Sequence, residues 1–453
     1  MSPVEAQLCP QPMLLHFDVN KTVMLTDSMD AKSHEEGIRE AVSDLFWGVL
    51  RKTADGWEWS WLGNDTIGSK PPRLPDLVGQ NGETVEYGTY ADYCKKIVKD
   101  KKDRKSVLRN FTKANPETKD AMERMVKLAA ANMELPGDIR NTDKIGLEKV
   151  GLKGNMYMML PAIFILVADL VRRRQPFAVV FRSFGKDHEK IKAEWNAFCE
   201  MKHPVFSKLL SGIGPLDGTV PGIPDRRLSS FHTLYRDADG PVLALDTFTN
   251  GPEEASWDAW AKMKPPCETD TRNGRMFLRD VIRCQVLEGL DSLEQFFEKL
   301  LGKQGTIAIK DDWAWWTWNG ESNESGKLMP MMGKKKVNTI FFDDNIEQYE
   351  PRIVDCRDEF GNPAPKEKTL GITISKVNPV EAALDDRYFL RAVESCLQAS
   401  RRDSKNFLVG FDDTDIEGNG KTGTSTRATE PFATMKAANW DIFPNLLWCC
   451  RGT

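Results

Sequence analysis

Short apolar runs that end in a polar side chain recur along this chain. Runs of this kind fit strands that are buried on both faces of a parallel sheet. They cover residues 12–25, 177–183, 306–310 and 339–344. Between them, apolar residues repeat every three or four positions, which predicts helices. The helices are expected over 36–51, 156–174, 275–287, 292–301 and 387–399. Strands that alternate with helices predict an α/β protein with a parallel sheet.

Long segments separate these runs, so the sequence predicts a discontinuous core with two insertions. The core is expected over 11–30 with 155–200 and 300–400, a cap insertion over 31–154, a second insertion over 201–299, and an irregular C-terminal tail over 401–453. Within the cap, the alternation of Trp57, Trp59 and Trp61 predicts a strand. The tryptophans crowded into 313–318 predict a hairpin packed over the core.

Composition narrows the class of protein. The chain has 453 residues, 28% of them charged, and a formal net charge of -5, so no overall positive field favours nucleic acid. Its nine cysteines have no paired metal-ligand spacing, which indicates reduced thiols and a cytoplasmic protein. The longest apolar segment, 156–171, contains Pro161 and Asp169 and is shorter than the roughly 20 residues that span a bilayer. We therefore expect no membrane partner.

Four polar residues at the ends of the predicted strands suggest one site. Asp18, Ser183, Asp343 and Asp344 all follow apolar runs. Ligands of parallel α/β sheets bind outside the carboxyl ends of the strands, where these side chains are expected to meet. An aspartate there can attack phosphorus, and a divalent metal offsets the repulsion between the carboxylates and the phosphate. Mg²⁺ suits an oxygen-only site. Taken singly, each strand end fits an ordinary polar turn better.

The order of these motifs resembles the haloacid dehalogenase-like (HAD-like) superfamily. Asp18-Val19-Asn20-Lys21-Thr22 is similar to its first motif, Ser183 to its second, and Asp343-Asp344 to its fourth. The resemblance implies a Rossmannoid core in which Asp18 is the nucleophile and Ser183 binds the transferring phosphoryl group. It also implies that Mg²⁺ is held by Asp18, the backbone carbonyl of Asn20 and Asp343, with Asp344 nearby.

The third motif of that superfamily is a lysine, and this chain offers two candidates. Lys310 stands at a strand end, and Lys327 stands in Gly326-Lys327-Leu328-Met329-Pro330. The lysine would neutralise the charges of the nucleophile and the phosphate. The sequence around Lys327 resembles the usual motif better, so Lys327 is favoured and Lys310 remains open.

Asn20 departs from the pattern of the phosphatases in this superfamily, which carry an aspartate at this position. That aspartate protonates the leaving group and later activates water, and an asparagine has no proton to give. An asparagine could also close the turn after the first strand as an Asx turn. The two interpretations are compatible.

Three functions therefore stay open. The leading hypothesis is Mg²⁺-dependent hydrolysis of a small or medium phosphorylated substrate through an aspartyl-phosphate on Asp18. The main alternative is a catalytically weak or inactive HAD-like protein that binds phosphate and metal. The third is a dehalogenase-type hydrolase, in which the nucleophile attacks carbon and needs no metal.

Two histidines and three motifs in the tail are further candidates. His16 precedes the nucleophile on the same face of its strand and fits a core histidine better than a replacement base, whereas His188 is expected nearer the cleft. The tail resembles a P-loop end at 418–422, half a calcium loop at 413–418, and the opening of archaeal agmatinylcytidine synthetases at 407–415. Each match is incomplete, so no activity is assigned to the tail.

Overall fold

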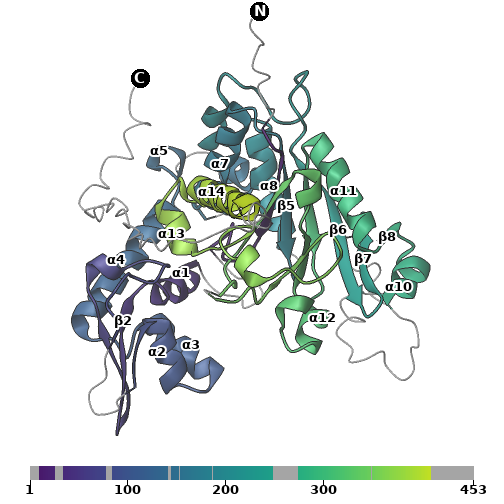
Figure 1. The fold of residues 1–453 in the computed structure, drawn as a ribbon. Helices are drawn as coiled ribbons and strands as arrows, with labels where there is room; N and C mark the ends of the chain where they lie inside the picture. The colour runs from purple at the N-terminus through teal and green to yellow at the C-terminus, as the bar shows by residue number, and fades with distance from the viewer. Residues whose placement is uncertain are drawn as a thin grey trace, which may run out of the picture.

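The computed structural model describes residues 10–25, 34–77, 84–140, 144–152, 154–185, 187–247, 274–347 and 349–409. A largely parallel eight-stranded sheet lies at the centre of this part of the chain, in the order β13-β11-β1-β5-β9-β6-β7-β8 (Figure 1). The strands are β1 Met13–Asp18, β5 Phe177–Ser183, β6 Leu228–Asp237, β7 Gly240–Ala244, β8 Val286–Glu288, β9 Thr306–Lys310, β11 Asn338–Asp343 and β13 Ile374–Lys376. The strands from β13 to β6 run parallel, and β7 and β8 add antiparallel pairs at one edge. The expected α/β class is confirmed.

Both faces of the sheet are covered, which explains why its central strands are apolar throughout. On one face, Phe17, Phe181 and Phe342 pack in a large core with α7 (Pro161–Arg172), α8 (His188–Cys199), α13 (Pro379–Leu384) and α14 (Tyr388–Val409). On the other face, Leu14 and Val180 pack against α11 (Leu290–Lys303). Every residue of β1 and β5 is buried. Strands enclosed in this way need no polar alternation.

A second unit lies between β1 and α7 in the sequence and projects away from the main sheet (Figure 1). Its antiparallel sheet has the order β3-β2-β4. The elements are α1 His34–Ser43, β2 Trp47–Thr53, β3 Gly56–Trp61, β4 Val85–Thr89, α2 Tyr90–Ile97, α3 Lys101–Asn110, α4 Pro116–Asn132, α5 Gly137–Arg140 and α6 Lys144–Lys149. The unit is fixed to α13, because Ser69 donates hydrogen bonds to Glu381 from its backbone N (2.8 Å) and its Oγ (2.5 Å).

The remaining elements are short, and one of them, η2, lies between β3 and β4 in the second unit. They are β10 Lys327–Pro330, β12 Val354–Arg357, α10 Gly274–Met276, the π-helix η5 Phe277–Ile282, α12 Trp313–Trp318, and the 3₁₀ helices η2 Asn64–Thr66, η3 Phe206–Leu210, η6 Asn323–Ser325, η7 Gly333–Lys335 and η8 Lys366–Lys368. Strands β10 and β12 pair in parallel as a separate two-stranded sheet. Each described helix is too short or too polar to cross a lipid bilayer.

Several sequence-based predictions differ from the structure. The helix expected over 36–51 ends at Ser43, and its last turns are the strand β2. The tryptophans of 313–318 form the helix α12, not a hairpin, because the Asp312 side chain accepts a hydrogen bond from the Trp315 backbone N and caps the helix (3.0 Å).

The second insertion and the tail also differ from the expectation, as does one helix within the insertion. The segment 201–299, expected as a second insertion, contributes β6, β7 and β8 to the main sheet. The helix predicted over 275–287 is instead α10, η5 and β8. The tail expected from 401 is helical as far as Val409, where α14 ends. Of the three tail motifs, those at 413–418 and 418–422 and most of the one at 407–415 lie outside the described residues.

A fully buried ion pair stands between β5 and the segment after β9. Arg182 is fully enclosed and makes a bidentate contact with Asp311, in which its Nε lies 2.9 Å from Oδ2. The same guanidinium donates to the backbone carbonyl of Leu328 from Nη1 and Nη2, both at 3.1 Å. Arg182 therefore joins the central sheet to the strand that carries Lys327.

We expect Asp311→Asn to lower the free energy of unfolding by about 3–5 kcal/mol, because it leaves the Arg182 charge buried without a counter-charge. Asp225→Asn is the matched control. This variant breaks the ion pair between Asp225 and Arg227, whose side chains are 47% and 38% exposed, respectively. It should lower the free energy of unfolding by about 1 kcal/mol or less. Urea unfolding of both variants measures the difference. Equal losses would show that burial of the Arg182 pair is energetically unimportant.

Candidate active site

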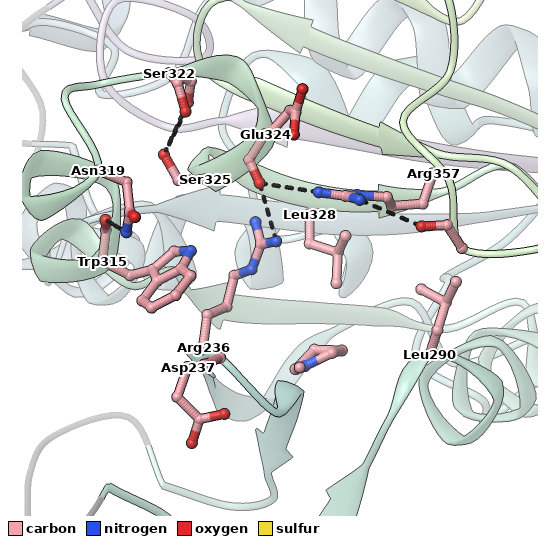
Figure 2. A pocket seen from close by; sticks show the side chains of 14 residues that line it. Arg236, Asp237, Leu290, Trp315, Asn319, Ser322, Glu324, Ser325, Leu328 and Arg357 are labelled. Atoms are coloured by element: carbon pink, nitrogen blue, oxygen red, sulfur yellow. Dashed lines mark hydrogen bonds between the residues drawn. The ribbon is translucent and has the colours of Figure 1, made fainter.

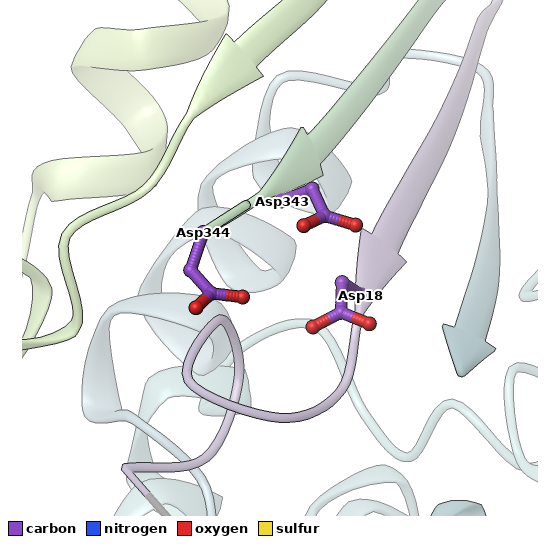
Figure 3. Close-up of side chains that lie close together, drawn as sticks. All are labelled: Asp18, Asp343 and Asp344. Carbon is purple, nitrogen blue, oxygen red and sulfur yellow. The ribbon is translucent and has the colours of Figure 1, made fainter. Parts of the chain in front are cut away.

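Three carboxylates meet where β1 and β11 end (Figure 3). Phe17 pairs with Phe342 in the parallel register, so the next residue on each strand, Asp18 and Asp343, stand side by side. One carboxylate oxygen from each of Asp18, Asp343 and Asp344 can be chosen so that all three atoms lie within 4.8 Å of one another. Asp18 and Asp343 are buried, and Asp344 is half-buried. The structure thus brings together the acidic residues that the strand ends predicted.

Lys327 bridges two of these carboxylates. Its Nζ lies 2.5 Å from Asp18 Oδ1 and 2.7 Å from Asp343 Oδ2, and the side chain is 2% exposed. The backbone of β10 reaches this place because residue 326 is glycine. A Cβ atom at Gly326 would lie 2.2 Å from the carbonyl oxygen of Ile353, which accepts a hydrogen bond from the Lys327 backbone N. The close approach of the two backbones therefore requires a glycine directly before Lys327.

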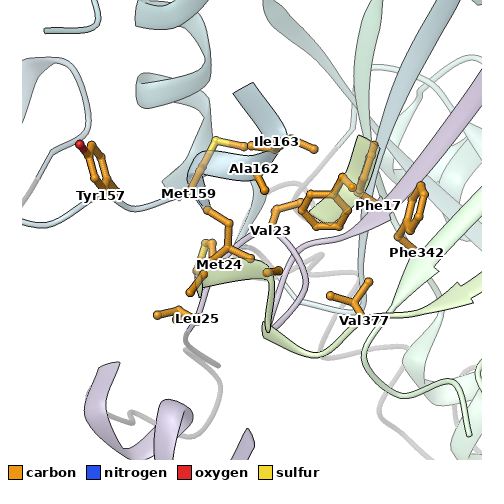
Figure 4. Close-up of a cluster of buried hydrophobic side chains, with 14 of the residues drawn as sticks. Phe17, Val23, Met24, Leu25, Tyr157, Met159, Ala162, Ile163, Phe342 and Val377 are labelled. Carbon is orange, nitrogen blue, oxygen red and sulfur yellow. The ribbon is translucent and has the colours of Figure 1, made fainter. Parts of the chain in front are cut away.

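The turn after Asp18 is held by backbone bonds and by the core. The backbone N atoms of Val23 and Met24 both donate to the carbonyl of Val19, at 3.2 and 3.0 Å. Val23 and Met24 lie among the buried side chains around Met159 (Figure 4). This places Thr22, whose Oγ1 accepts a hydrogen bond from the Asp344 backbone N at 3.1 Å. The loops after β1 and β11 are therefore linked directly.

The site holds three carboxylates and one buried ammonium group, that of Lys327. Burial raises the pKa of Asp18 well above its usual range, the charge of Lys327 opposes this, and the charges of Asp343 and Asp344 add to it. Burial alone would lower the pKa of Lys327, but the charges of Asp18 and Asp343 outweigh burial and the net shift is upward. Three carboxylates around one ammonium group favour the binding of a further cation.

Asn20 is bound to a side chain that the sequence did not indicate. Its Nδ2 donates a hydrogen bond to Asp187 Oδ2 at 2.8 Å, and Asp187 also pairs with Lys190 at 3.0 Å. The Asn20 Oδ1 atom is buried and has no hydrogen-bond partner among the described residues. The expected Asx turn is therefore wrong, because that turn requires Oδ1 to accept a backbone N–H. The available signal for Asp187 was a carboxylate four residues after the end of the apolar run 177–183, just past Gly185.

Ser183 and Lys310 lie on β5 and β9, on the opposite side of β1 from the strand that carries Asp343. Ser183 ends β5 next to β1, is buried, and accepts a hydrogen bond on its Oγ from the Gly185 backbone N at 2.9 Å. Lys310 pairs with Ser183 in the register of β9, two strands away from β1. Of the two candidate lysines, Lys327 is the one that contacts the Asp18 carboxylate.

Both candidate histidines are fully buried. His16 stacks on Phe341 with a centroid distance of 5.4 Å, and its Nδ1 lies 3.3 Å from Arg182 Nη1. Burial first, and the charge of Arg182 second, lower its pKa well below the usual value. Burial and the charge of Lys327 lower the pKa of His188 to about 3. A general base at neutral pH needs a pKa near 7, so neither ring suits that role.

The donors present suit a hard divalent cation. Asp18, Asp343 and Asp344 offer only oxygen, the ligand type that Mg²⁺ and Ca²⁺ prefer. Asp343 Oδ1 is oriented by a hydrogen bond from the Asn345 backbone N at 2.8 Å, and Asp344 Oδ1 by one from the Asn345 side chain at 3.0 Å. Asn20, whose backbone carbonyl is the expected fourth ligand, lies in the turn that follows Asp18.

Comparison of the chain with family models, with curated proteins and with solved structures finds no match. The resemblance of its motifs to the HAD-like superfamily therefore remains a hypothesis that rests on the residues themselves.

We expect a divalent cation to stabilise the protein through these carboxylates. At about 100 times its dissociation constant, Mg²⁺ should add about 2.7 kcal/mol to the free energy of unfolding. Asp343→Asn should abolish most of that increment, whatever its effect on the metal-free protein, whereas Glu350→Gln should retain it. Glu350 is exposed and pairs with Lys366 at 3.0 Å. Thermal unfolding with Mg²⁺ and with a chelator makes the comparison; an increment that survives in Asp343→Asn would place the cation elsewhere.

Proposed function

We propose that this chain is a HAD-like hydrolase that cleaves phosphomonoesters of small or medium size, with Mg²⁺ as the cofactor and Asp18 as the nucleophile. The observation that carries the proposal is the contact of Lys327 with both Asp18 and Asp343 at the carboxyl edge of a parallel sheet. A buried lysine between two carboxylates neutralises their charge at the position where a phosphoryl group would arrive. In this proposal the main sheet with its flanking helices is the core, and the unit between β1 and α7 is the cap.

The reaction would proceed in two displacements. In the first, a carboxylate oxygen of Asp18 attacks phosphorus, the bond from phosphorus to the ester oxygen breaks, and the alcohol leaves. In the second, a water oxygen attacks phosphorus, the bond from phosphorus to Asp18 breaks, and inorganic phosphate leaves as the carboxylate is restored. When bound, Mg²⁺ would supply charge neutralisation between the carboxylates and the phosphoryl oxygens.

The residues of this chain have separable roles in those steps. Lys327 holds Asp18 by a hydrogen bond, and its charge opposes the rise that burial causes in the pKa of the Asp18 carboxyl. Asp343 and Asp344 would ligate the metal, together with Asp18 and the backbone carbonyl of Asn20. Ser183 is proposed to donate a hydrogen bond to the phosphoryl group from the end of β5. The proposal assigns Lys310 no direct contact with the nucleophile.

Asn20 limits the rate of this reaction. Its amide donates to Asp187 and has no acidic proton, so the leaving alcohol must take its proton from water. Good leaving groups, such as aryl phosphates, suffer least from this loss. The same hydrogen bond is the observation that favours the second candidate function, a HAD-like protein that binds phosphate and metal with little or no turnover. A dehalogenase-type reaction remains the third hypothesis and predicts turnover in chelator.

We expect Asp18→Asn to abolish the hydrolysis of an aryl phosphate in Mg²⁺, and Lys327→Met to lower kcat by about 10²-fold or more, because each removes charge from the reacting centre. Lys310→Met is the matched control, since it removes a second buried lysine that is two strands from β1 and should change kcat much less. Steady-state kinetics of the three variants tests this. A larger loss in Lys310→Met than in Lys327→Met would reverse the assignment.

The pairing of Asn20 with Asp187 makes a double variant informative. Asn20→Asp alone would place two carboxylates at hydrogen-bond distance, which raises the pKa of one of them. Asn20→Asp with Asp187→Asn restores one acid and one amide in exchanged positions. If the acid/base group is what the chain lacks, the double variant should hydrolyse alkyl phosphates about 10²- to 10⁴-fold faster than the parent.

The single variant Asn20→Asp should show a smaller gain with a displaced pH optimum, and Asp187→Asn alone should show none. The pH dependence of kcat for the four proteins measures these differences. An active parent that gains nothing from either replacement would mean that the proton comes from another group.

A further inference from the structure

A cavity lies beside the segment that leads into β10 (Figure 2). It has a volume of about 490 Å³, within the range of sites that bind small organic molecules. Its walls come from the β6–β7 turn, the start of α11, α12 and the segment 319–328. Asp18, Asp343 and Lys327 do not line it, so this cavity is separate from the carboxylate site.

Two arginines give one wall of the cavity a positive charge. Arg236 Nη2 and Arg357 Nε each lie 2.7 Å from opposite oxygens of the buried Asp355. Both guanidinium groups also donate to the backbone carbonyl of Glu324 at 3.1 Å, while the Glu324 carboxylate points away from them (Figure 2). The nearby Asp237 is neutralised by a bidentate contact with Arg275 at 2.8 Å. The two guanidinium groups thus share one carboxylate, that of Asp355, and the buried Asp312 accepts a hydrogen bond on its Oδ2 from the Arg236 backbone N at 3.1 Å.

Donors remain available on these side chains. A guanidinium has five N–H groups. In the described chain, Arg236 uses three of them, on Gly326, Glu324 and Asp355. Arg357 likewise uses three, on Asp355, Gly361 and Glu324. The fork-shaped group suits phosphate or carboxylate oxygens.

The indole N–H of Trp315 is an independent observation that indicates a ligand in the cavity. Its Nε1 atom is buried and has no hydrogen-bond acceptor among the described residues, although the side chain lines the cavity. The indole nitrogen lies on the side of the ring that faces Arg236 (Figure 2). A buried N–H without an acceptor is unfavourable, and an acceptor in the cavity would satisfy it. Leu290, Leu328 and the indole ring provide apolar surface next to these donors.

We propose that this cavity binds an organic anion with an aromatic ring, about the size of a mononucleotide. The anionic group accepts hydrogen bonds from Arg236, Arg357 and the Trp315 N–H, and the ring lies against the indole and the two leucines. Arg236 also donates to the carbonyl of Gly326 at 2.8 Å, directly before Lys327. The bound anion therefore contacts the side chain that fixes the start of β10. This site does not depend on the proposed hydrolysis.

Calorimetric titration of Asp18→Asn protein with AMP, in chelator, tests the proposal without turnover or metal. Adenosine and inorganic phosphate are the controls for the ring and the anion, and each should bind at least about tenfold more weakly than AMP. Trp315→Phe, which removes only the N–H donor, and Arg357→Gln should each raise the Kd for AMP by about tenfold. Trp313→Phe is the matched control, because Trp313 is 46% exposed on the same helix and does not line the cavity.

Three results would overturn the proposal. One is the absence of AMP binding at millimolar concentration, and another is adenosine binding as tight as that of AMP. The third is an AMP affinity that is unchanged in Trp315→Phe and Arg357→Gln but lost in Lys327→Met, which would place the ligand at the carboxylate site. Circular dichroism of each variant separates a loss of binding from a loss of fold.

Discussion

The contact of Lys327 with Asp18 and Asp343 is the constraint that organises this end of the molecule. A lysine that is 2% exposed is stable only if its charge is compensated, and the two carboxylates that compensate it come from neighbouring strands of the main sheet. The backbone around Lys327 must therefore approach the sheet edge closely. Residue 326 is a glycine, because a Cβ atom there would collide with the backbone of Ile353. Arg182 donates a hydrogen bond to the backbone carbonyl of Leu328. The small β10–β12 sheet is thus tied to the main sheet by charge as well as by apolar packing.

The sequence predicts the centre of this structure better than its periphery. Strands β1, β5, β9 and β11 are predictable because burial on both faces requires uninterrupted apolar runs, and the meeting of Asp18 with Asp343-Asp344 follows from the parallel register. The helix predicted over 36–51 is longer than the observed helix, because the apolar positions around Phe46 and Leu50 fit a helical face as well as a strand. The place of β6 to β8 in the main sheet depends on pairing across distant segments, which local periodicity does not encode. The same rule of polar strand ends that selected Asp18 applies to Asp311, which follows β9 directly.

The hydrogen bond from Asn20 to Asp187 joins residues 167 positions apart, so no local motif could reveal it. This hydrogen bond gives a structural reason for an asparagine at position 20. An aspartate at position 20 would face Asp187 at hydrogen-bond distance and would compete with it for a proton. The amide instead satisfies one oxygen of Asp187, and its own Oδ1 is buried and has no partner among the residues that the structure describes. The chain therefore has a neutral, ordered side chain where the proposed reaction would use an acid, and the loop keeps its shape without one.

The excess of carboxylates over lysine at the sheet edge has a consequence for the proposed reaction. Two of the three acids contact Lys327, and Asp344 is half-buried beside them. In the proposed hydrolysis, three ionised carboxylates without a metal would repel a phosphate group, and a bound cation would remove that repulsion. The proposed reaction would therefore follow a fixed order, in which the cation binds before the phosphorylated substrate.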